Sequence, residues 1–230
     1  MISRVVAQRR RFLGKTVFNL SMRVGETGQI RMRGSHPGDN STLFDLLVGA
    51  GTLQVYVPSA GAVFHGNIAG EGSPFGARFG VEPWDLTPII LIGRRLAASE
   101  FTVIPGQRVR TLIMSPRDAE ADGLVRVEVE SASGLPRSAS WERGRARWTV
   151  QYLAWAIVGD ESEPEGVWLM PSRFVIRRSR PRVQVEVSRR SNVQQYRINP
   201  SADRRAFQIP VPAGTGIASL EELADALEGK

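Results

Sequence analysis

Acid–base catalysis needs carboxylates or histidines that face a common cleft. The candidate carboxylates of this chain are Asp45, Asp85, Glu128 and Glu130. Glu128 and Glu130 are two residues apart in a segment where apolar and polar residues alternate, so both belong to the polar, solvated face of a predicted strand. This spacing does not indicate a general acid–base pair.

Nucleophilic catalysis needs a serine that is held next to a base. Ser35 precedes His36, and Ser41 lies near Asp45, but neither pair forms a nucleophile elbow or an ordered triad. The sequence therefore contains no recognisable active site, and we predict that the protein is not an enzyme.

Metal and cofactor sites are equally poorly supported. The chain has no cysteine, which excludes thiol catalysis, disulfides and thiolate metal sites, and its only histidines, His36 and His65, stand in glycine-rich surroundings. The glycine-rich stretch 67–80 lacks the lysine and the serine or threonine that follow a phosphate-binding loop. We expect no metal and no cofactor, and we interpret this stretch as a flexible connection.

Alternation of apolar and polar residues is the main structural signal, and it predicts strands with one solvated and one apolar face. The clearest runs cover residues 18–24, 53–57, 125–129, 148–152 and 183–187. An apolar sheet face must be covered by a second sheet, by helices, by closure of the sheet or by a ligand. Few helical stretches are available, so the sequence predicts a mainly β (α+β) domain of antiparallel, strongly bent strands with two or three helices.

The best helix candidate is a lid helix over residues 82–98. Pro83 and Asp85 suit its first turn, and an apolar face follows, with Pro88 as a point where the helix could divide into two pieces. We expect this helix to lie across the concave face of the sheet.

Two terminal segments are also predicted to be helical. Residues 219–228 begin with the capping-box sequence Ser219 to Glu222. In the N-terminal basic segment, residues 1–14, the stretch 2–13 is expected to be a short basic helix or the end of a longer helix. The segment 199–214 is expected to be extended edge structure because of its prolines. No internal boundary divides the 230 residues, so we predict a single domain.

The net charge of +7 comes almost entirely from arginine, since only Lys15 and Lys230 are lysines. A general preference for arginine and contact with an anionic surface, such as phospholipid headgroups, both remain open. Nucleic acid is not an expected partner, because no recognition helix, RNP-type strand or zinc finger is present.

No apolar run approaches the ~20 residues of a membrane-spanning helix. No secretory signal opens the chain, since arginines follow Met1 without an apolar core. The chain is therefore expected to be either cytoplasmic or preceded in nature by a targeting segment that is missing here.

The order of motifs resembles a known family. Residues 23–66 read RVGETGQIRMRGSHPGDNSTLFDLLVGAGTLQVYVPSAGAVFHG, and far downstream come VWLMPSRFVIRR, VQVEVSRRSNVQQ and FQIPVPAG. This pattern, over residues 15–216, is similar to the lipoprotein-carrier superfamily of the bacterial envelope, the LolA- and LolB-like proteins and related outer-membrane lipoprotein-sorting proteins. Leu169 to Pro171, Asn192 and Phe207 to Gly214 stand where members carry comparable motifs.

The resemblance implies an incomplete antiparallel barrel whose concave apolar face, covered or plugged by helices, holds acyl chains. It also implies a location in the periplasm or at the outer membrane, with the signal segment removed. The chain departs from the family in its shortened or absent N-terminal helix, and only Arg94 and Arg95 are positional counterparts of the arginine that closes the carriers' lid.

The leading hypothesis is therefore non-catalytic binding of an acyl chain, lipid or lipoprotein in an apolar half-barrel cavity, for transport or sorting. The expected wall residues are Phe44, Leu46, Val55, Val57, Trp84, Leu86, Ile89 and Ile90. The alternative is a protein-interaction or envelope-stress regulatory module with the same fold, whose apolar face is covered by an envelope protein partner. An enzyme or a purely structural β domain is the third class.

Overall fold

The computed structural model describes residues 2–9, 15–24, 29–68, 82–115, 123–143, 146–158, 168–178, 183–189 and 204–228. The chain forms two compact units. The first unit comprises Met1–Val6, Thr16–Thr87 and Arg189–Lys230, and the second comprises Ala7–Lys15 and Pro88–Ser188. The single domain expected from the sequence stays a prediction.

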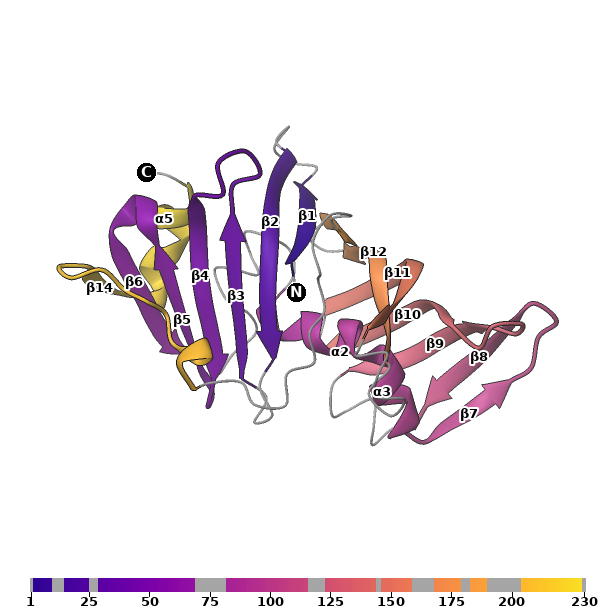
Figure 1. The fold of residues 1–230 in the computed structure, drawn as a ribbon. Helices are drawn as coiled ribbons and strands as arrows, with labels where there is room; N and C mark the ends of the chain where they lie inside the picture. Colours follow the sequence, from indigo (N-terminus) through magenta and orange to yellow (C-terminus); the bar gives the residue numbers. More distant parts are fainter. Residues whose placement is uncertain are drawn as a thin grey trace. The chain divides into compact units, whose positions relative to one another are not determined.

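The first unit is built on a sheet with the strand order β14-β6-β5-β4-β3-β2-β1 (Figure 1). Its strands are β1 (Ile2–Arg9), β2 (Lys15–Val24), β3 (Ile30–Ser35), β4 (Thr42–Gly49), β5 (Thr52–Val57), β6 (Ala62–Asn67) and β14 (Gly216–Ser219). Successive strands from β2 to β6 pair antiparallel, whereas β14 joins β6 in parallel. This parallel edge strand was not expected from the sequence.

The N-terminal segment corrects one prediction. Residues 2–9 form strand β1 and not the expected basic helix. The segment contains the β-branched residues Ile2, Val5 and Val6, and pairing in a sheet overrides the weak helix preference of so short a segment.

The turn between β4 and β5 is a tight two-residue connection. Ala50 and Gly51 both have positive φ, at 50° and 75°. Two successive residues with positive φ form the type of two-residue turn that matches the twist of a hairpin. Local turn chemistry therefore fixes the register of the pairs Leu46–Val55 and Val48–Leu53.

Short helices accompany the sheet of the first unit. They are η1 (Pro58–Ala60), η2 (Pro83–Asp85), the start of α2 (Leu86–Ile90), η4 (Arg204–Phe207), η5 (Leu220–Glu222) and α5 (Leu223–Glu228). The predicted capping box is confirmed, since Ser219 and Glu222 exchange hydrogen bonds at the start of η5. The described part of the segment 199–214 contains the helical turn η4, so the expectation of a wholly extended segment is wrong.

The second unit is an antiparallel sheet with the strand order β13-β12-β11-β10-β9-β8-β7. Its strands are β7 (Phe101–Ile104), β8 (Val109–Met114), β9 (Leu124–Glu130), β10 (Pro136–Arg143), β11 (Ala146–Val158), β12 (Trp168–Arg178) and β13 (Val183–Arg189). Pro88 to Ile90 of α2 and the whole of α3 (Ile92–Ala97) belong to this unit.

The predicted lid helix over residues 82–98 is not one rod. It consists of η2, α2 and α3, and Leu91 separates the last two with φ −93° and ψ 25°. Pro88 lies inside α2, at its third residue, where the missing N–H has no helical acceptor and is tolerated. The predicted division of the helix is therefore present, but it falls at Leu91 and not at Pro88.

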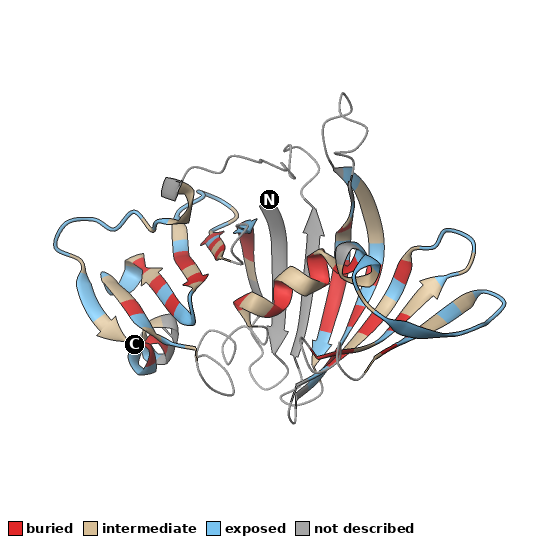
Figure 2. Ribbon diagram, turned by 90° about the horizontal axis from the view of Figure 1, so that it is seen from below, coloured by how far each residue is buried: buried red, intermediate tan, exposed pale blue. Residues whose placement is uncertain are grey.

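The predicted mainly β fold class is confirmed. In the described residues, each sheet is open and ends in an edge strand, β14 in the first unit and β7 in the second. Buried residues alternate with more exposed ones along strands such as β3 and β5 (Figure 2). Among the described residues, no helix has both the length and the apolar character needed to span a bilayer.

Candidate functional site

An apolar row of side chains crosses the first unit. Met22, Met32, Leu46, Val55 and Phe64 are register partners on successive strands from β2 to β6. All of them are buried, and so they lie on the apolar face that the alternating sequence pattern predicted. We call these residues the first-unit row.

Phe44 lies beside this row and fills the space above a glycine. Gly34 is its register partner on β3, and a Cβ atom added to Gly34 would meet the Phe44 ring. Phe18 packs against the same ring edge-on, with the ring centroids 5.5 Å apart. The predicted wall residues Phe44, Leu46, Val55 and Val57 are thus tightly packed core residues of the first unit.

The other predicted wall residues lie in the helical pieces. Trp84 is half-buried in η2, and Leu86 is buried at the start of α2, both within the first unit. Ile89 and Ile90 are buried in the second unit, where the Tyr152 hydroxyl donates a hydrogen bond to the Ile89 carbonyl oxygen at 3.1 Å. This hydrogen bond holds Ile89 against strand β11.

A second apolar row crosses the sheet of the second unit. Its members are successive register partners from β7 to β12, and every one is apolar: Val103, Leu112, Val127, Ala139, Val150 and Ile176. We call these residues the second-unit row. No polar residue interrupts it, so the face is one continuous apolar strip.

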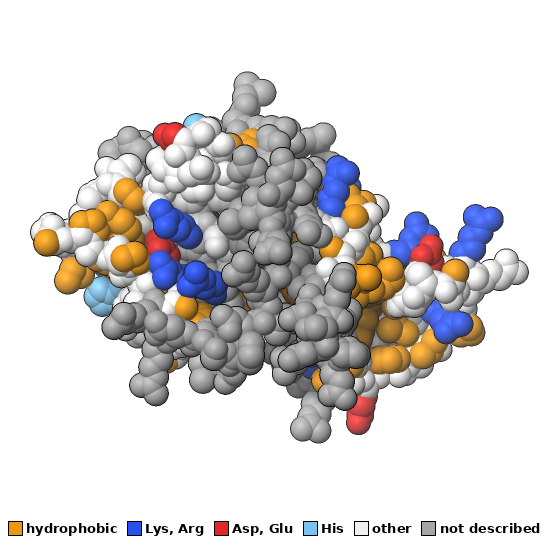
Figure 3. Space-filling model, in the orientation of Figure 1, with side chains coloured by type: hydrophobic (Ala, Val, Ile, Leu, Met, Phe, Trp, Pro, Cys, Tyr) orange, Lys and Arg blue, Asp and Glu red, His pale blue; other side chains and the backbone are white. Residues whose placement is uncertain are grey.

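The second-unit row is buried at one end and open at the other. Ile176, Val150, Ala139 and Val127 are at most 2% exposed, whereas Val103 on the edge strand is 48% exposed. Phe101, next to Val103 on the same face of β7, is 38% exposed. Hydrophobic side chains gather over β8 and β9 on the face shown in Figure 3. This open end of an apolar face is the candidate functional site.

Two polar groups lie on the same apolar face. The pKa of the Tyr152 hydroxyl is raised well above its usual value by burial, which keeps this group neutral and able to donate to Ile89. The indole Nε1 of Trp141 is buried and has no hydrogen-bond partner within the described part of the chain. A buried N–H without an acceptor costs free energy, so such a group indicates water or a ligand atom as a partner.

The carboxylates considered for catalysis have structural partners. Arg31 donates two hydrogen bonds to Asp45, from Nε to Oδ1 at 3.0 Å and from Nη2 to Oδ2 at 2.6 Å. It also donates a hydrogen bond to the carbonyl oxygen of Ala206 in η4. The hydrogen bond to Asp45 raises the pKa of Arg31, against a smaller opposing effect of burial. The pair anchors η4 to the sheet.

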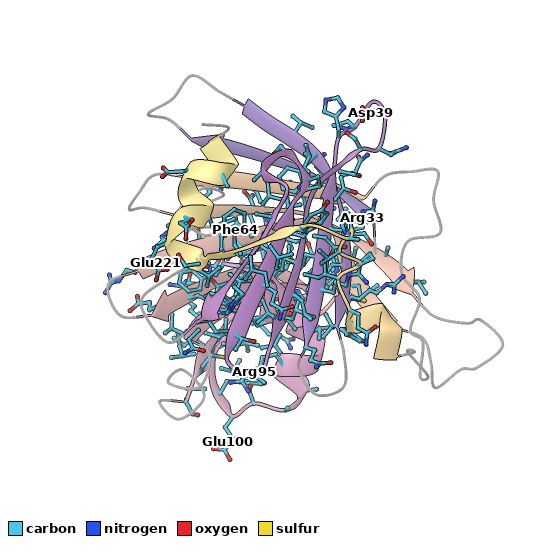
Figure 4. The ribbon with its side chains drawn as sticks, turned by 90° about the vertical axis from the view of Figure 1, so that its left-hand side faces the viewer. Arg33, Asp39, Phe64, Arg95, Glu100 and Glu221 are labelled. Atoms are coloured by element: carbon cyan, nitrogen blue, oxygen red, sulfur yellow. The ribbon has the colours of Figure 1, made fainter. Side chains whose placement is uncertain are left out.

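Of the other candidate carboxylates, Asp85 is buried in η2, whereas Glu128 and Glu130 belong to strand β9 of the second unit. Glu128 accepts hydrogen bonds from Arg126 and Ser138 on the polar face of the second-unit sheet. Asp39 lies in the β3–β4 loop (Figure 4), where the backbone N–H and the hydroxyl of Ser41 lower its pKa. No group of three His, Cys, Asp or Glu side chains able to hold a metal ion occurs among the described residues.

Sequence reasoning missed the open end of the second-unit row. The segment Phe101–Ile104 contains one polar residue, Thr102, and is too short for alternation to distinguish an exposed face from a buried one. The signal that was available is its place before Pro105, which suits an edge strand. The glycine-rich stretch 69–80, Asn192 and the side chain of Arg94 lie outside the described residues, and Arg95 is half-buried in α3.

Comparison with known proteins gives a likeness in fold alone. A DUF1329 family protein from Desulfovibrio piger is 13% identical and superposes with a TM-score of 0.54, covering 90% of this chain and 88% of that chain. An outer membrane lipoprotein-sorting protein domain from Vibrio parahaemolyticus is 12% identical, with a TM-score of 0.47 and coverages of 90% and 88%. A LolA superfamily protein from Nitrosomonas europaea is 10% identical, with a TM-score of 0.45 and coverages of 84% and 86%.

No protein-family model and no curated protein sequence matches the chain. The likeness to the DUF1329 family protein extends over most of this chain and most of that chain, so it concerns the whole fold and not one motif. In its fold, the chain is therefore similar to this DUF1329 family protein.

Proposed function

We propose that the protein binds the acyl chain of a lipid or lipoprotein without turning it over, at the open end of the second-unit row. The observation that carries this proposal is an uninterrupted apolar row that is buried at Ile176 and reaches solvent at Val103. An apolar strip that continues from the core to the surface offers a chain of methylene groups a place to lie. Each buried methylene contributes about 0.8 kcal/mol, so an acyl chain binds without a specific polar contact.

Trp141 adds a polar feature to the proposed site. Its buried N–H has no described partner, and an ester or amide carbonyl at the head of an acyl chain would supply the acceptor. This favours an esterified or amide-linked chain over a plain hydrocarbon. Ile89 and Ile90 would form the helical cover of the same face, which is the role expected of them from the sequence.

The wall residues of the first unit form a separate part of the proposal. Phe44, Leu46, Val55, Val57, Trp84 and Leu86 would meet a ligand only if the helical pieces of that unit moved away from the sheet. The resemblance of the motifs supports a role in lipoprotein or lipid transport or sorting in the periplasm or at the outer membrane. Arginine-rich surface would then favour peripheral contact with anionic headgroups.

Uptake of a fluorescent fatty-acid ester probe tests the proposal. Phe101→Ser should weaken probe binding by about tenfold, since it removes one large apolar contact. The matched control is Ile113→Ser, because Ile113 is 37% exposed, almost as much as Phe101, but lies on the opposite face of the neighbouring strand. Val103→Asp should act like Phe101→Ser, whereas the control should bind like the wild type.

Native mass spectrometry of protein purified from a bacterial envelope provides the second measurement. Co-purified lipid would support the proposal, and Trp141→Phe, which removes only the N–H, should then reduce retention of an ester more than retention of a hydrocarbon probe. If the wild type carries no lipid and takes up no probe, the binding function is wrong. An interaction module, with an envelope protein partner covering the same apolar strip, would take its place.

A further inference from the structure

Strand β7 is an edge strand of the described sheet, and neither a charged residue nor a proline lies within its four residues. All four of its residues, Phe101 to Ile104, are exposed, and none is charged. Soluble proteins commonly protect an edge strand with a charge, a proline or a bulge, because its free backbone groups otherwise pair with another chain. Figure 1 shows β7 at the end of the second-unit sheet, and among the described strands its only register partner is β8.

The hydrogen-bond pattern shows which backbone groups of β7 face outward. The Ser115 N–H donates to the Glu100 carbonyl oxygen at 2.9 Å, so Glu100 and Ser115 are a hydrogen-bonded pair. Hydrogen-bonded and non-hydrogen-bonded pairs alternate along an antiparallel ladder. Thr102 and Ile104 therefore bond to β8, and the N–H and C=O groups of Phe101 and Val103 point away from the sheet.

These outward groups suit a partner with the same spacing. If β7 pairs antiparallel with a second β7 about Thr102, Phe101 of each copy lies opposite Val103 of the other. Both residues then exchange N–H and C=O bonds in both directions. Pro105, the next outward position, has no N–H and would end the ladder. A register centred on Val103 would instead set Phe101 against Pro105 and lose part of the bonding.

Side chains and charges favour the same partner. Phe101 and Val103 would form aromatic–β-branched pairs across the new strand junction, which stabilise antiparallel sheets. The Glu100 end of one strand would lie beside the Pro105–Arg108 turn of the other. Because of the two-fold symmetry, this places an acidic Glu100 near a basic Arg108 at both ends of the junction. Glu100 projects from the end of β7 (Figure 4), and Arg108 is exposed in the turn.

We propose that β7 pairs antiparallel with β7 of a second copy of this chain, centred on Thr102, to form a two-fold symmetric dimer with a continuous sheet. A two-fold axis perpendicular to the sheet keeps the apolar face of each copy on the same side. The second-unit rows of the two copies would then join into one longer apolar strip. This proposal concerns the strand edge and does not depend on lipid binding.

A single introduced cysteine tests the register, because the natural chain has no cysteine. Thr102 would face Thr102 of the second copy in a non-hydrogen-bonded pair, whose Cα atoms lie about 4.5 Å apart, within disulfide range. Oxidised Thr102→Cys protein should therefore run as a covalent dimer without reductant. The matched control is Ile113→Cys, on the same face of β8 but one strand away from the junction. Equal cross-linking of the two variants would overturn the proposal.

Light scattering over a concentration series tests the pairing without a new covalent bond. Val103→Pro removes only an outward N–H, so the monomer keeps its bonds to β8. The dissociation constant of the dimer should rise about tenfold or more. Thr102→Ser, which preserves the backbone, should leave the dimer intact. A wild type that stays monomeric at every concentration, or a β7 found paired with a peptide of another protein, would overturn the proposal.

Discussion

At the scale of single residues, Gly34 and Phe44 determine how the core of the first unit packs. A Cβ atom at position 34 would overlap the Phe44 ring, which already packs against Phe18. Gly34→Ala should lower the free energy of unfolding by about 1–3 kcal/mol through overpacking. Denaturant unfolding measures this effect.

Gly93 offers a matched control for that substitution. A Cβ atom at Gly93 in α3 would meet nothing within 4 Å. Gly93→Ala should therefore raise stability by up to about 1 kcal/mol through helix propensity. Equal effects of the two substitutions would contradict the packing described for Phe44.

The buried Tyr152 hydroxyl should make the free energy of unfolding depend on pH in the alkaline range. Burial raises its pKa above the value of about 10 expected in the unfolded chain. The folded state is therefore fully favoured below about pH 10 and loses stability as the pH rises toward the folded pKa, because the unfolded chain releases the proton more easily.

Tyr152→Phe should show this dependence by difference. At neutral pH the variant should be less stable by about 1 kcal/mol, because the bond to the Ile89 carbonyl is lost. Above about pH 10 the gap between wild type and variant should shrink, since only the wild type carries the buried hydroxyl. Urea unfolding at several pH values measures the gap, and a constant gap would contradict burial of the hydroxyl.

Residue-level reasoning from the sequence found buried residues better than it found a site. Phe44, Leu46, Val55 and Val57 were placed correctly on the inward face, because alternation in a strand reports which face a side chain occupies. Alternation does not report whether that face is filled. The packing of Phe44 over Gly34 depends on register between strands, and the exposure of Val103 depends on its place at the sheet edge.

At the scale of elements, the start of η5 and α5 shows a strong local signal. The Ser219 hydroxyl and backbone N–H both bond to the Glu222 carboxylate, at 3.1 and 3.2 Å. Ser219→Ala should destabilise the protein by about 1 kcal/mol, because it removes the helix cap. Thermal unfolding measures this loss, with Ala218→Ser as a nearby control outside the cap. An unchanged midpoint would show that the cap adds nothing to the docking of Leu220 and Leu223.

Elements defined by local chemistry were predictable, and elements defined by distant partners were not. The β4–β5 hairpin and the capping box are encoded within a few residues, by positive-φ positions and by the Ser219–Glu222 spacing. Strands β1 and β14 depend on neighbours that are remote in sequence, so local patterns favoured a helix for the first and gave no signal for the second. The helix break was predicted at Pro88 but lies at Leu91, where neither a proline nor a capping side chain marks it.

At the scale of the whole molecule, the path of the chain links the two units. Each unit is assembled from separate stretches, and strand β1 itself begins in the first unit and ends in the second. No single cut in the chain would release either unit complete. This connectivity favours the single domain predicted from the sequence over two independent domains.

Calorimetry distinguishes these possibilities. If the chain is one cooperative domain, heating should give one transition, with a calorimetric enthalpy equal to the van't Hoff enthalpy. Gly34→Ala in the first unit and Tyr152→Phe in the second should then both shift that one transition downward. Two resolved transitions, each moved by only one of the substitutions, would show that the units unfold independently. The apolar strip of the second unit would in that case be the property of a separable domain.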